Sequence, residues 1–476
     1  MVVYDYHVNA QIVNLARKDA EFIYAGKRGG HHTLTQDEIN AVLVEQAKKG
    51  RTVCRLKGGD PFIFGRGGEE AETLVEAGIP FEVVPGISSA IAAPAYAGIP
   101  LTHRKFATTV AFIPGHEDRE KTGSAIAWDK IMGIDTLVFL MGVRNLPYIA
   151  EQLMAHGRPS ETPVAIIRWG TRAEQNTVTS TLGGVAELVK SRDIRPPSVM
   201  VVGDVVNLRE HLSWFEKKPL FGARILATRQ DTGGFEPLAR LGAEIVEFPT
   251  IEQRDPESWE DADRAIGEIG SFDRLVFTSA NGAAYFMRRL MELGRDIRDL
   301  AGIRICAIGP KTRDSLERFG LRVEMVPEDF RAEGLVAAFG DVCGKRILLP
   351  RAKEARDLFP DAVRAAGGEI AVVTVYRTVA PDRHSKRLAR LLREGRINVA
   401  TFTSASTFKN LVSMIGSEAV ELLRGVTIAA IGPVTRKSIE KQGLTVTVMP
   451  ERATIEDMAN AIRDWAEANI PVSRAG

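Results

Sequence analysis

The stretch from Arg55 to Glu70 holds the residues whose types and spacing most clearly allow chemistry. It reads Arg-Leu-Lys-Gly-Gly-Asp-Pro-Phe-Ile-Phe-Gly-Arg-Gly-Gly-Glu-Glu and follows an apolar run at 52–56. Because glycine has no Cβ, such a loop at the end of a strand can bring main-chain N–H and C=O groups against a ligand. Charged side chains among the glycines favour a ligand-binding loop. For the Gly-Gly-Asp triplet alone, a turn whose glycines only avoid strain is an equal alternative.

A second set of candidates comes from an internal repeat in the C-terminal half. The segment Val276-Phe-Thr-Ser-Ala-Asn-Gly282 is echoed at 400–407, and Cys306-Ala-Ile-Gly-Pro-Lys-Thr-Arg313 is echoed at 429–436. In the first pair an apolar strand ends in Thr-Ser, where a helix begins. The repeat distance is too long for a solenoid. It predicts two related α/β lobes that face one another.

Helix N-termini of this kind can bind anions, because their free N–H groups and the helix dipole favour a carboxylate or phosphate. Open α/β sheets place ligands beyond the carboxyl ends of their strands. We therefore expect four such ends to converge on a cleft between the lobes, at Ser279, Gly309, Ser404 and Gly432. The alternative for any single serine or threonine is that it only caps its own helix.

Composition narrows the class of protein. A net charge of +1 with 26% charged residues lacks the basic excess of a nucleic-acid binder. Three scattered cysteines without metal spacing indicate reduced thiols in a cytosolic protein. No apolar run approaches the roughly 20 residues that cross a bilayer, and the start Met1-Val-Val-Tyr-Asp5 lacks the features of a secretion signal. We expect a cytoplasmic protein that binds neither nucleic acid nor membranes.

Further motifs in the N-terminal half connect the glycine-rich loop to a known family. They are Val3-Tyr-Asp5, Gly26-Lys-Arg-Gly-Gly-His-His32, Val83-Val-Pro-Gly-Ile-Ser-Ser-Ala90 and Ala95-Tyr-Ala-Gly-Ile-Pro-Leu-Thr-His-Arg104. In this order, and up to Trp214-Phe215, the chain resembles the uroporphyrinogen-III C-methyltransferase family. The resemblance implies transfer of the methyl group of S-adenosylmethionine to two pyrrole carbons of uroporphyrinogen III, which gives precorrin-2. The cofactor supplies the electrophile, so the protein must align it, exclude water and remove a proton.

The resemblance also implies site residues. The expected contacts to S-adenosylmethionine are Gly58, Gly59, Asp60, Ile63, Ser88, Ser89, Met141 and Gly170. Asp5 takes the proton-acceptor position and Lys27 the proton-donor position, with a helix cap and a surface charge as the respective alternatives. The histidines His31, His32, His103 and His116 lack the clustered acidic or thiol partners of a metal site, so we expect no metal.

Two features depart from the family pattern. The family begins with a strand and a Gly-Ala-Gly-Pro-Gly-Asp loop before the position of Asp5, and this loop helps to form the cofactor site. We hypothesise that the natural protein is longer at its N-terminus and that the chain as given methylates poorly, with an unpaired sheet edge and exposed apolar surface. The second departure is Pro114, where the family usually has threonine; proline removes one N–H near the substrate.

The C-terminal half resembles uroporphyrinogen-III synthase from about Gly222 to about Arg463. The ordered motifs are Thr228-Arg229, Thr278-Ser279-Ala280-Asn281-Gly282, Ile308-Gly309-Pro310-Lys311-Thr312, Pro350-Arg351-Ala352, Val375-Tyr376-Arg377, Thr403-Ser404 and Ile431-Gly432-Pro433. The family cyclises hydroxymethylbilane, a linear octacarboxylate, to uroporphyrinogen III with inversion of the last ring. Because the bilane also closes spontaneously without inversion, positioning should matter more than a strong acid or base.

Roles in this half follow from the same resemblance. Tyr376 could donate a proton to the leaving hydroxyl, and a tyrosine without a chemical role is the alternative. The expected substrate contacts are Arg229, Ser279, Asn281, Gly309, Lys311, Thr312, Arg351, Ser404 and Gly432. Arginine suits forked pairing with carboxylates. Any one of the cationic side chains can instead be a solvated surface charge.

Together these patterns predict an α/β protein with a two-lobed tetrapyrrole methyltransferase fold followed by a two-lobed synthase fold. The polar, proline-bearing segment at Lys217-Lys218-Pro219 marks the boundary. The expected domains are 1–215, a linker at 216–222 and 223–470, the last with lobes of about 223–252 plus 380–470 and of 253–379. The predicted function is a bifunctional enzyme of tetrapyrrole synthesis. The alternatives are a synthase with an inactive methyltransferase remnant and a non-catalytic tetrapyrrole-binding protein. By resemblance, the first half is expected to form a homodimer.

Overall fold

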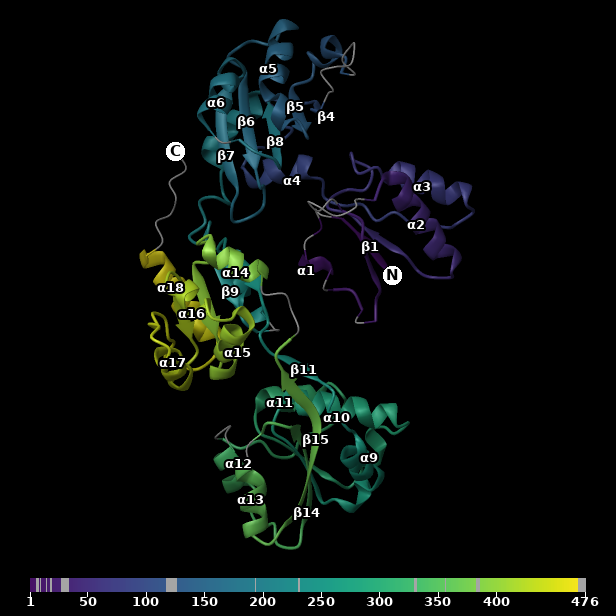
Figure 1. Ribbon diagram of the computed structural model, residues 1–476, viewed down its shortest axis with the longest axis vertical. Coiled ribbons are helices and arrows are strands. Elements are labelled where there is room, and N and C mark those ends of the chain that lie inside the picture. The colour runs from purple at the N-terminus through teal and green to yellow at the C-terminus, as the bar shows by residue number, and fades with distance from the viewer. Residues whose placement is uncertain are drawn as a thin grey trace. The chain divides into compact units, whose positions relative to one another are not determined.

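The computed structural model describes residues 1–469, apart from 6, 7, 9, 14, 18, 27–33, 117–125, 193, 230, 231, 329–331, 356 and 382–385 (Figure 1). The chain divides into two compact units. The first comprises Met1–Ala223 with Leu238–Glu244 and the residues from Ala466 on, and the second comprises Arg224–Pro237 and Ile245–Trp465. Within the described ranges, no helix is both long and apolar enough to cross a membrane.

The first lobe of the first unit is built on a short parallel sheet. Its elements are β1 (Val2–Tyr4), α1 (Ala10–Val13), β2 (Phe22–Tyr24), α2 (Gln36–Lys48), β3 (Cys54–Leu56) and α3 (Gly67–Glu76). The strand order is β2-β1-β3. Val3 of β1 packs against Ile39 and Leu43 of α2. Thr35 begins α2 with a capping box, in which its hydroxyl accepts from the Glu38 N–H at 3.3 Å and the Glu38 carboxylate accepts from the Thr35 N–H at 2.6 Å.

The second lobe is a five-stranded mixed sheet covered on both faces. Its elements are α4 (Ser89–Tyr96), β4 (Val110–Pro114), β5 (Thr136–Leu140), α5 (Leu146–Ala155), β6 (Pro163–Arg168), β7 (Asn176–Thr181), α6 (Val185–Ser191), β8 (Ser198–Val202) and α7 (Arg209–Leu212). The strand order is β4-β5-β8-β6-β7. Successive side chains of a strand point to opposite faces. Ile166 therefore packs in the core with α5 and α6, whereas Ile167 packs in the core with α4.

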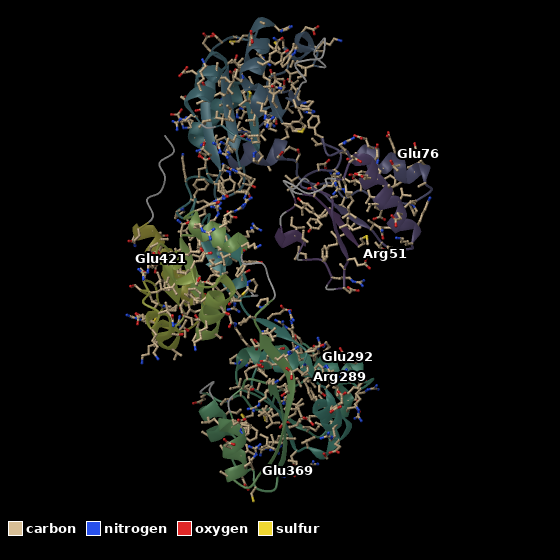
Figure 2. All side chains as sticks on the ribbon, viewed as in Figure 1. Arg51, Glu76, Arg289, Glu292, Glu369 and Glu421 are labelled. Carbon is tan, nitrogen blue, oxygen red and sulfur yellow. The ribbon has the colours of Figure 1, made fainter. Side chains whose placement is uncertain are left out.

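The second unit contains two further sheets. The five-stranded sheet, in the order β11-β15-β14-β12-β13, is formed by β11 (Glu252–Arg254), β12 (Arg274–Phe277), β13 (Arg304–Ala307), β14 (Arg346–Ala352) and β15 (Glu369–Val379). Its helices are α9 (Glu260–Gly267), α10 (Ala280–Glu292), α11 (Pro310–Glu317), α12 (Ala332–Ala338) and α13 (Leu358–Ala365). Charge pairs lie on its surface; Arg289 and Glu292 of α10, labelled in Figure 2, are 3.2 Å apart.

The four-stranded sheet joins segments that are far apart in the sequence. Its order is β10-β9-β16-β17, with β9 (Arg224–Ala227), β10 (Glu244–Glu247), β16 (Val399–Phe402) and β17 (Thr427–Ala430). Its helices are α8 (Glu236–Arg240), α14 (Lys386–Arg393), α15 (Ala405–Ile415), α16 (Ala419–Leu423), α17 (Pro433–Glu440) and α18 (Ile455–Asn469). β9 pairs in parallel with β16, so Ala400 lies opposite Leu226. The chain therefore enters this lobe, leaves it at β11 and returns after β15.

A buried ion pair joins the end of the first unit to its second sheet. The Glu216 carboxylate accepts hydrogen bonds from Gln175 and Thr177, each at 2.7 Å, and from Arg209, whose guanidinium also donates to the Ala97 carbonyl at 2.5 Å. Glu216 is only 4% exposed. Although the sequence places Glu216 at the start of the linker, its side chain belongs to the folded unit because it neutralises the buried Arg209.

We predict that Glu216→Ala destabilises the first unit by about 3–5 kcal/mol, because Arg209 is left as an uncompensated buried charge. Calorimetry should show the transition of the N-terminal half at a lower temperature. Glu210→Ala, which removes an exposed carboxylate from α7, is the matched control and should change little. Equal melting temperatures for the two variants would contradict the prediction.

Candidate functional site

The glycine-rich loop after β3 is held by one carboxylate. The Oδ1 atom of Asp60 accepts from the N–H groups of Phe62 at 2.9 Å and Ile63 at 3.1 Å, and its Oδ2 atom accepts from the Gly86 N–H at 3.0 Å. These main-chain donors, Gly86 first, lower the pKa of Asp60. The carboxylate therefore folds the loop onto itself and ties it to the segment before α4.

The segment at 86–89 lies directly against this loop. A Cβ placed on Gly86 would lie 2.6 Å from the Gly59 carbonyl oxygen, so only glycine allows this approach. The buried Ser88 begins α4 and accepts from the Ala90 N–H at 3.2 Å. The structure thus brings five of the predicted cofactor contacts together, namely Gly58, Gly59, Asp60, Ser88 and Ser89, and Ile63 follows in the same loop.

The two other predicted cofactor contacts follow strands of the second sheet. Met141 comes directly after β5 with a φ of 57° and is 52% exposed. Gly170 comes after β6, and a Cβ on it would lie 2.5 Å from the Ala93 Cβ in α4. Thr171 follows with a φ of 74° and donates its N–H to Gln175 at 2.8 Å. Gly170 therefore packs on the helix that Ser88 begins, next to the network of Glu216.

Asp5 lies at the carboxyl end of β1 in a network of charges that the sequence analysis did not anticipate. An Arg55 nitrogen lies 3.5 Å from the Asp5 carboxylate, and Arg55 also donates to Glu70 at 3.2 Å. Lys57 donates to the same Glu70 oxygen at 2.9 Å, and Glu70 is 5% exposed. The signal in the sequence was a charged residue, Arg55, within a short apolar strand. The other predicted residue, Lys27, lies outside the described residues.

In the five-stranded sheet of the second unit, the predicted residues lie at the carboxyl ends of neighbouring strands. Ser279 begins α10, accepts from the Gly282 N–H at 2.9 Å and is 3.1 Å from the Tyr376 hydroxyl. Burial raises the pKa of Tyr376, although its hydrogen bond with Ser279 opposes that effect. Tyr285 packs on Tyr376, with 5.4 Å between ring centroids. The Tyr376 hydroxyl is therefore protonated at neutral pH and lies within hydrogen-bonding distance of Ser279.

The remaining residues of this lobe differ in exposure. Arg351 is near the end of β14 and forms an ion pair with Asp357 at 2.5 Å. Gly309 begins α11 after β13, in an extended conformation that a following proline favours. Thr312 is buried in the first turn of α11, whereas Lys311 and, in α10, Asn281 are exposed. Lys311 and Asn281 can contact a ligand without rearrangement, and Thr312 has a packing role as well.

The four-stranded sheet repeats this arrangement without the tyrosine. Ser404 begins α15 and accepts from the Thr407 N–H at 3.2 Å, and Gly432 begins α17. Arg229 follows β9 two residues after its end. Both serines therefore cap their own helices, as the alternative interpretation held. Ser279 differs because its hydroxyl also meets Tyr376, whereas the Ser404 hydroxyl meets Ser406 at 2.8 Å.

Two family models match the chain. The model of Tetrapyrrole (Corrin/Porphyrin) Methylases matches residues 1–186, and the model of Uroporphyrinogen-III synthase HemD matches residues 236–460. The predicted order of a tetrapyrrole methyltransferase fold followed by a synthase fold is thereby confirmed.

Similar proteins agree with both matches. A porphyrin biosynthesis protein HemD from Ruminiclostridium josui is 36% identical over 99% of this chain and 94% of that protein. A uroporphyrinogen-III C-methyltransferase from Priestia megaterium is 56% identical over 44% of this chain and 87% of that protein. A solved uroporphyrin III C-methyl transferase from Thermus thermophilus is 35% identical, covering 44% of this chain and 86% of its own, with a TM-score of 0.37. The chain belongs to the uroporphyrinogen-III C-methyltransferase family through its N-terminal half and to the HemD family of uroporphyrinogen-III synthases through its C-terminal half.

Proposed function

We propose that this chain is a bifunctional enzyme that cyclises hydroxymethylbilane to uroporphyrinogen III and then methylates this product to precorrin-2. The observation that carries the proposal is that both family models match one chain, in two separate regions. The methyl donor is S-adenosylmethionine, as the name of a 52% identical methyltransferase from Methanosarcina barkeri states for that protein. We place the enzyme in the cytoplasm and expect a homodimer through its methyltransferase half, by resemblance to the family.

In the methyltransferase half, the proposed contacts to the cofactor are Gly58, Gly59, Asp60, Ile63, Ser88, Ser89, Met141 and Gly170. The cofactor supplies an electrophilic methyl group when it is bound. The chain positions it with main-chain groups of the glycine-rich loop, which the Asp60 carboxylate keeps in one conformation. Asp5 is the proposed proton acceptor, since it lies at a strand end and an Arg55 nitrogen lies 3.5 Å from its carboxylate. Lys27 is the proposed proton donor.

In the synthase half, the proposed donor to the leaving hydroxyl is Tyr376. Its 3.1 Å contact with Ser279 fixes the phenol, and its raised pKa keeps the proton on the oxygen until transfer. The proposed carboxylate contacts are Arg229, Ser279, Asn281, Gly309, Lys311, Thr312, Arg351, Ser404 and Gly432. Main-chain N–H groups at helix starts suit a substrate with eight carboxylates. The helix fixes their direction, and they donate hydrogen bonds without carrying a full charge of their own.

An anaerobic assay tests both activities. The purified chain receives enzymatically generated hydroxymethylbilane, with and without S-adenosylmethionine, and isomers I and III and precorrin-2 are resolved. We expect isomer III without the cofactor and precorrin-2 with it. Asp5→Asn should leave isomer III unchanged and slow precorrin-2 formation about a hundredfold; Glu21→Gln, an exposed acid of the same lobe, is the control. Isomer III without precorrin-2 from the unchanged chain would indicate a synthase with an inactive remnant.

Asp60→Asn should weaken binding of S-adenosylhomocysteine about tenfold, because an amide nitrogen cannot accept the Gly86 N–H. Calorimetric titration measures the affinity, and hydrogen exchange of the Phe62, Ile63 and Gly86 amides should accelerate. The pKa of Asp60 is lowered in the folded protein. In the wild type, the loop should therefore stay anchored at any pH above the ordinary pKa of a carboxyl group, and it should loosen as the pH falls through the lowered pKa of Asp60. Glu69→Gln, in the first turn of α3 directly after the loop, is the control. Unaltered exchange in Asp60→Asn would refute this role.

Tyr376→Phe should lower the rate of isomer III formation about ten- to a hundredfold and raise the share of isomer I, because the bilane then closes spontaneously before inversion. The phenyl ring keeps the packing against Tyr285, so stability should change little. Isomer ratios by chromatography give the readout. Tyr148→Phe, in the other half, is the control, and a wild-type ratio in Tyr376→Phe would remove the tyrosine from the mechanism.

A further inference from the structure

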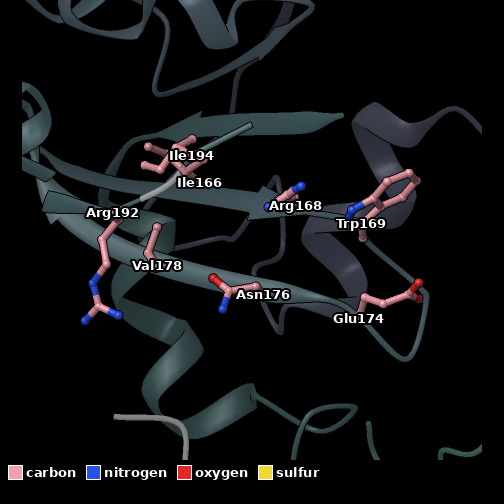
Figure 3. A pocket seen from close by; sticks show the side chains of 8 residues that line it. All are labelled: Ile166, Arg168, Trp169, Glu174, Asn176, Val178, Arg192 and Ile194. Atoms are coloured by element: carbon pink, nitrogen blue, oxygen red, sulfur yellow. The ribbon is translucent and has the colours of Figure 1, made fainter. Parts of the chain in front are cut away.

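Gln175 lies between two segments that carry proposed contacts to S-adenosylmethionine. It stands near the end of the loop that joins β6 to β7, and Gly170 lies in the same loop. Figure 3 shows this loop beside a pocket, with Trp169 at the end of β6 and Glu174 just before β7. Gln175 is only 5% exposed, and no sequence motif pointed to it. A buried amide needs hydrogen-bond partners for both of its polar atoms.

The partners of the Gln175 amide come from three different segments. Its Oε1 atom accepts from the Thr171 N–H at 2.8 Å. Its Nε2 atom donates to the Tyr96 carbonyl at 3.2 Å and to the Glu216 carboxylate at 2.7 Å. These partners belong to the loop after β6, to the end of α4 and to the segment after α7. The position therefore requires one acceptor and two donors on one planar group, a combination that only asparagine and glutamine supply.

The loop that Gln175 contacts has an unusual backbone. Trp169 and Thr171, on either side of Gly170, have φ values of 50° and 74°, which side chains other than glycine rarely adopt. Such conformations persist only where the surrounding structure imposes them. Gly170 itself lies so close to α4 that an added Cβ would be 2.5 Å from the Ala93 Cβ. The bond from Thr171 to Gln175 is thus one of the contacts that keep this loop against α4.

The carboxyl end of α4 is fixed by the same amide. The last carbonyl groups of a helix need partners from outside the helix. The Tyr96 carbonyl accepts from Gln175, and the Ala95 carbonyl accepts from the Trp214 indole at 3.0 Å. Because α4 has only eight residues, a shift at Tyr96 also displaces Ser88 at its start. One side chain therefore sets the positions of both segments.

We propose that Gln175 is a positioning residue of the cofactor site, which holds the loop of Gly170 and the helix of Ser88 in fixed positions relative to one another. This role rests on the proposed binding of S-adenosylmethionine to these two segments. Gln175 acts through the main chain of Gly170, so its loss leaves the cofactor to order the loop on binding, which costs affinity. The competing explanation is that Gln175 only satisfies the buried Glu216 carboxylate and serves stability alone.

Calorimetric titration of the full chain with S-adenosylhomocysteine separates these two roles. Gln175→Met keeps the length of the side chain and removes all three hydrogen bonds, so we expect it to weaken binding about tenfold. Thr177→Val is the matched control, because Thr177 of β7 donates the single proton of its hydroxyl to the same Glu216 oxygen at 2.7 Å. Both variants should melt at a lower temperature than the wild type, but only Gln175→Met should lose affinity.

Hydrogen exchange of peptides that cover residues 169–175 gives a readout that does not depend on the cofactor. Exchange should accelerate in Gln175→Met and stay as in the wild type in Thr177→Val. Gln175→Asn keeps the buried amide but is one carbon shorter than the wild type, and it provides a second variant with the same expected losses should Gln175→Met fail to fold.

The outcomes distinguish this proposal from the proposed function. No binding by the wild type would refute the cofactor site itself, and the exchange of the loop would then decide alone whether Gln175 holds it. Equal affinity in the wild type and Gln175→Met, equal losses of affinity in Gln175→Met and Thr177→Val, or unchanged exchange of the loop would each overturn the role of Gln175.

Discussion

The position of the carboxyl ends of parallel strands is the constraint on which the rest of this structure depends. Side chains within such strands are buried, so polar groups for a ligand can only follow where the strand ends. Asp5 follows β1, Gly58 follows β3 and Ser279 follows β12 by at most two residues. Contacts from other segments then complete each region. The Asp60 bond to Gly86 joins the loop after β3 to the segment before α4, and the Ser279 contact with Tyr376 joins the end of β12 to β15.

Much of the fold was open to prediction because its signals are local. A run of apolar residues followed by Thr-Ser or Gly-Pro is enough to predict a strand, a helix start and the side of the sheet on which both ends lie. Ser279 and Ser404 show why this succeeds, since each bonds an N–H only three residues away. Glycine at 170 was similarly informative, because a Cβ there would lie 2.5 Å from the Ala93 Cβ.

Contacts between distant segments could not be predicted in the same way. Nothing near Asp60 in the sequence shows that its second oxygen binds an N–H 26 residues later. Glu70 was counted among the charged residues that favour a ligand-binding loop, and Arg55 was given no role of its own, yet the two form a nearly buried network that reaches Asp5. Positive φ values at Met141 and Trp169 were equally hidden, because tertiary packing imposes them on residues that do not favour them.

The charge balance of the chain explains why recognition has to be local. With 62 basic and 61 acidic residues, the chain has almost no net charge, so a long-range field cannot draw in a substrate with eight carboxylates. Each carboxylate must instead meet a donor that is fixed in place. The duplicated lobes supply such donors twice, through helix starts at Ser279 and Ser404, but only one lobe adds a tyrosine. In the proposed function, binding is therefore distributed over the repeat, and the chemistry is confined to the one copy that has the tyrosine.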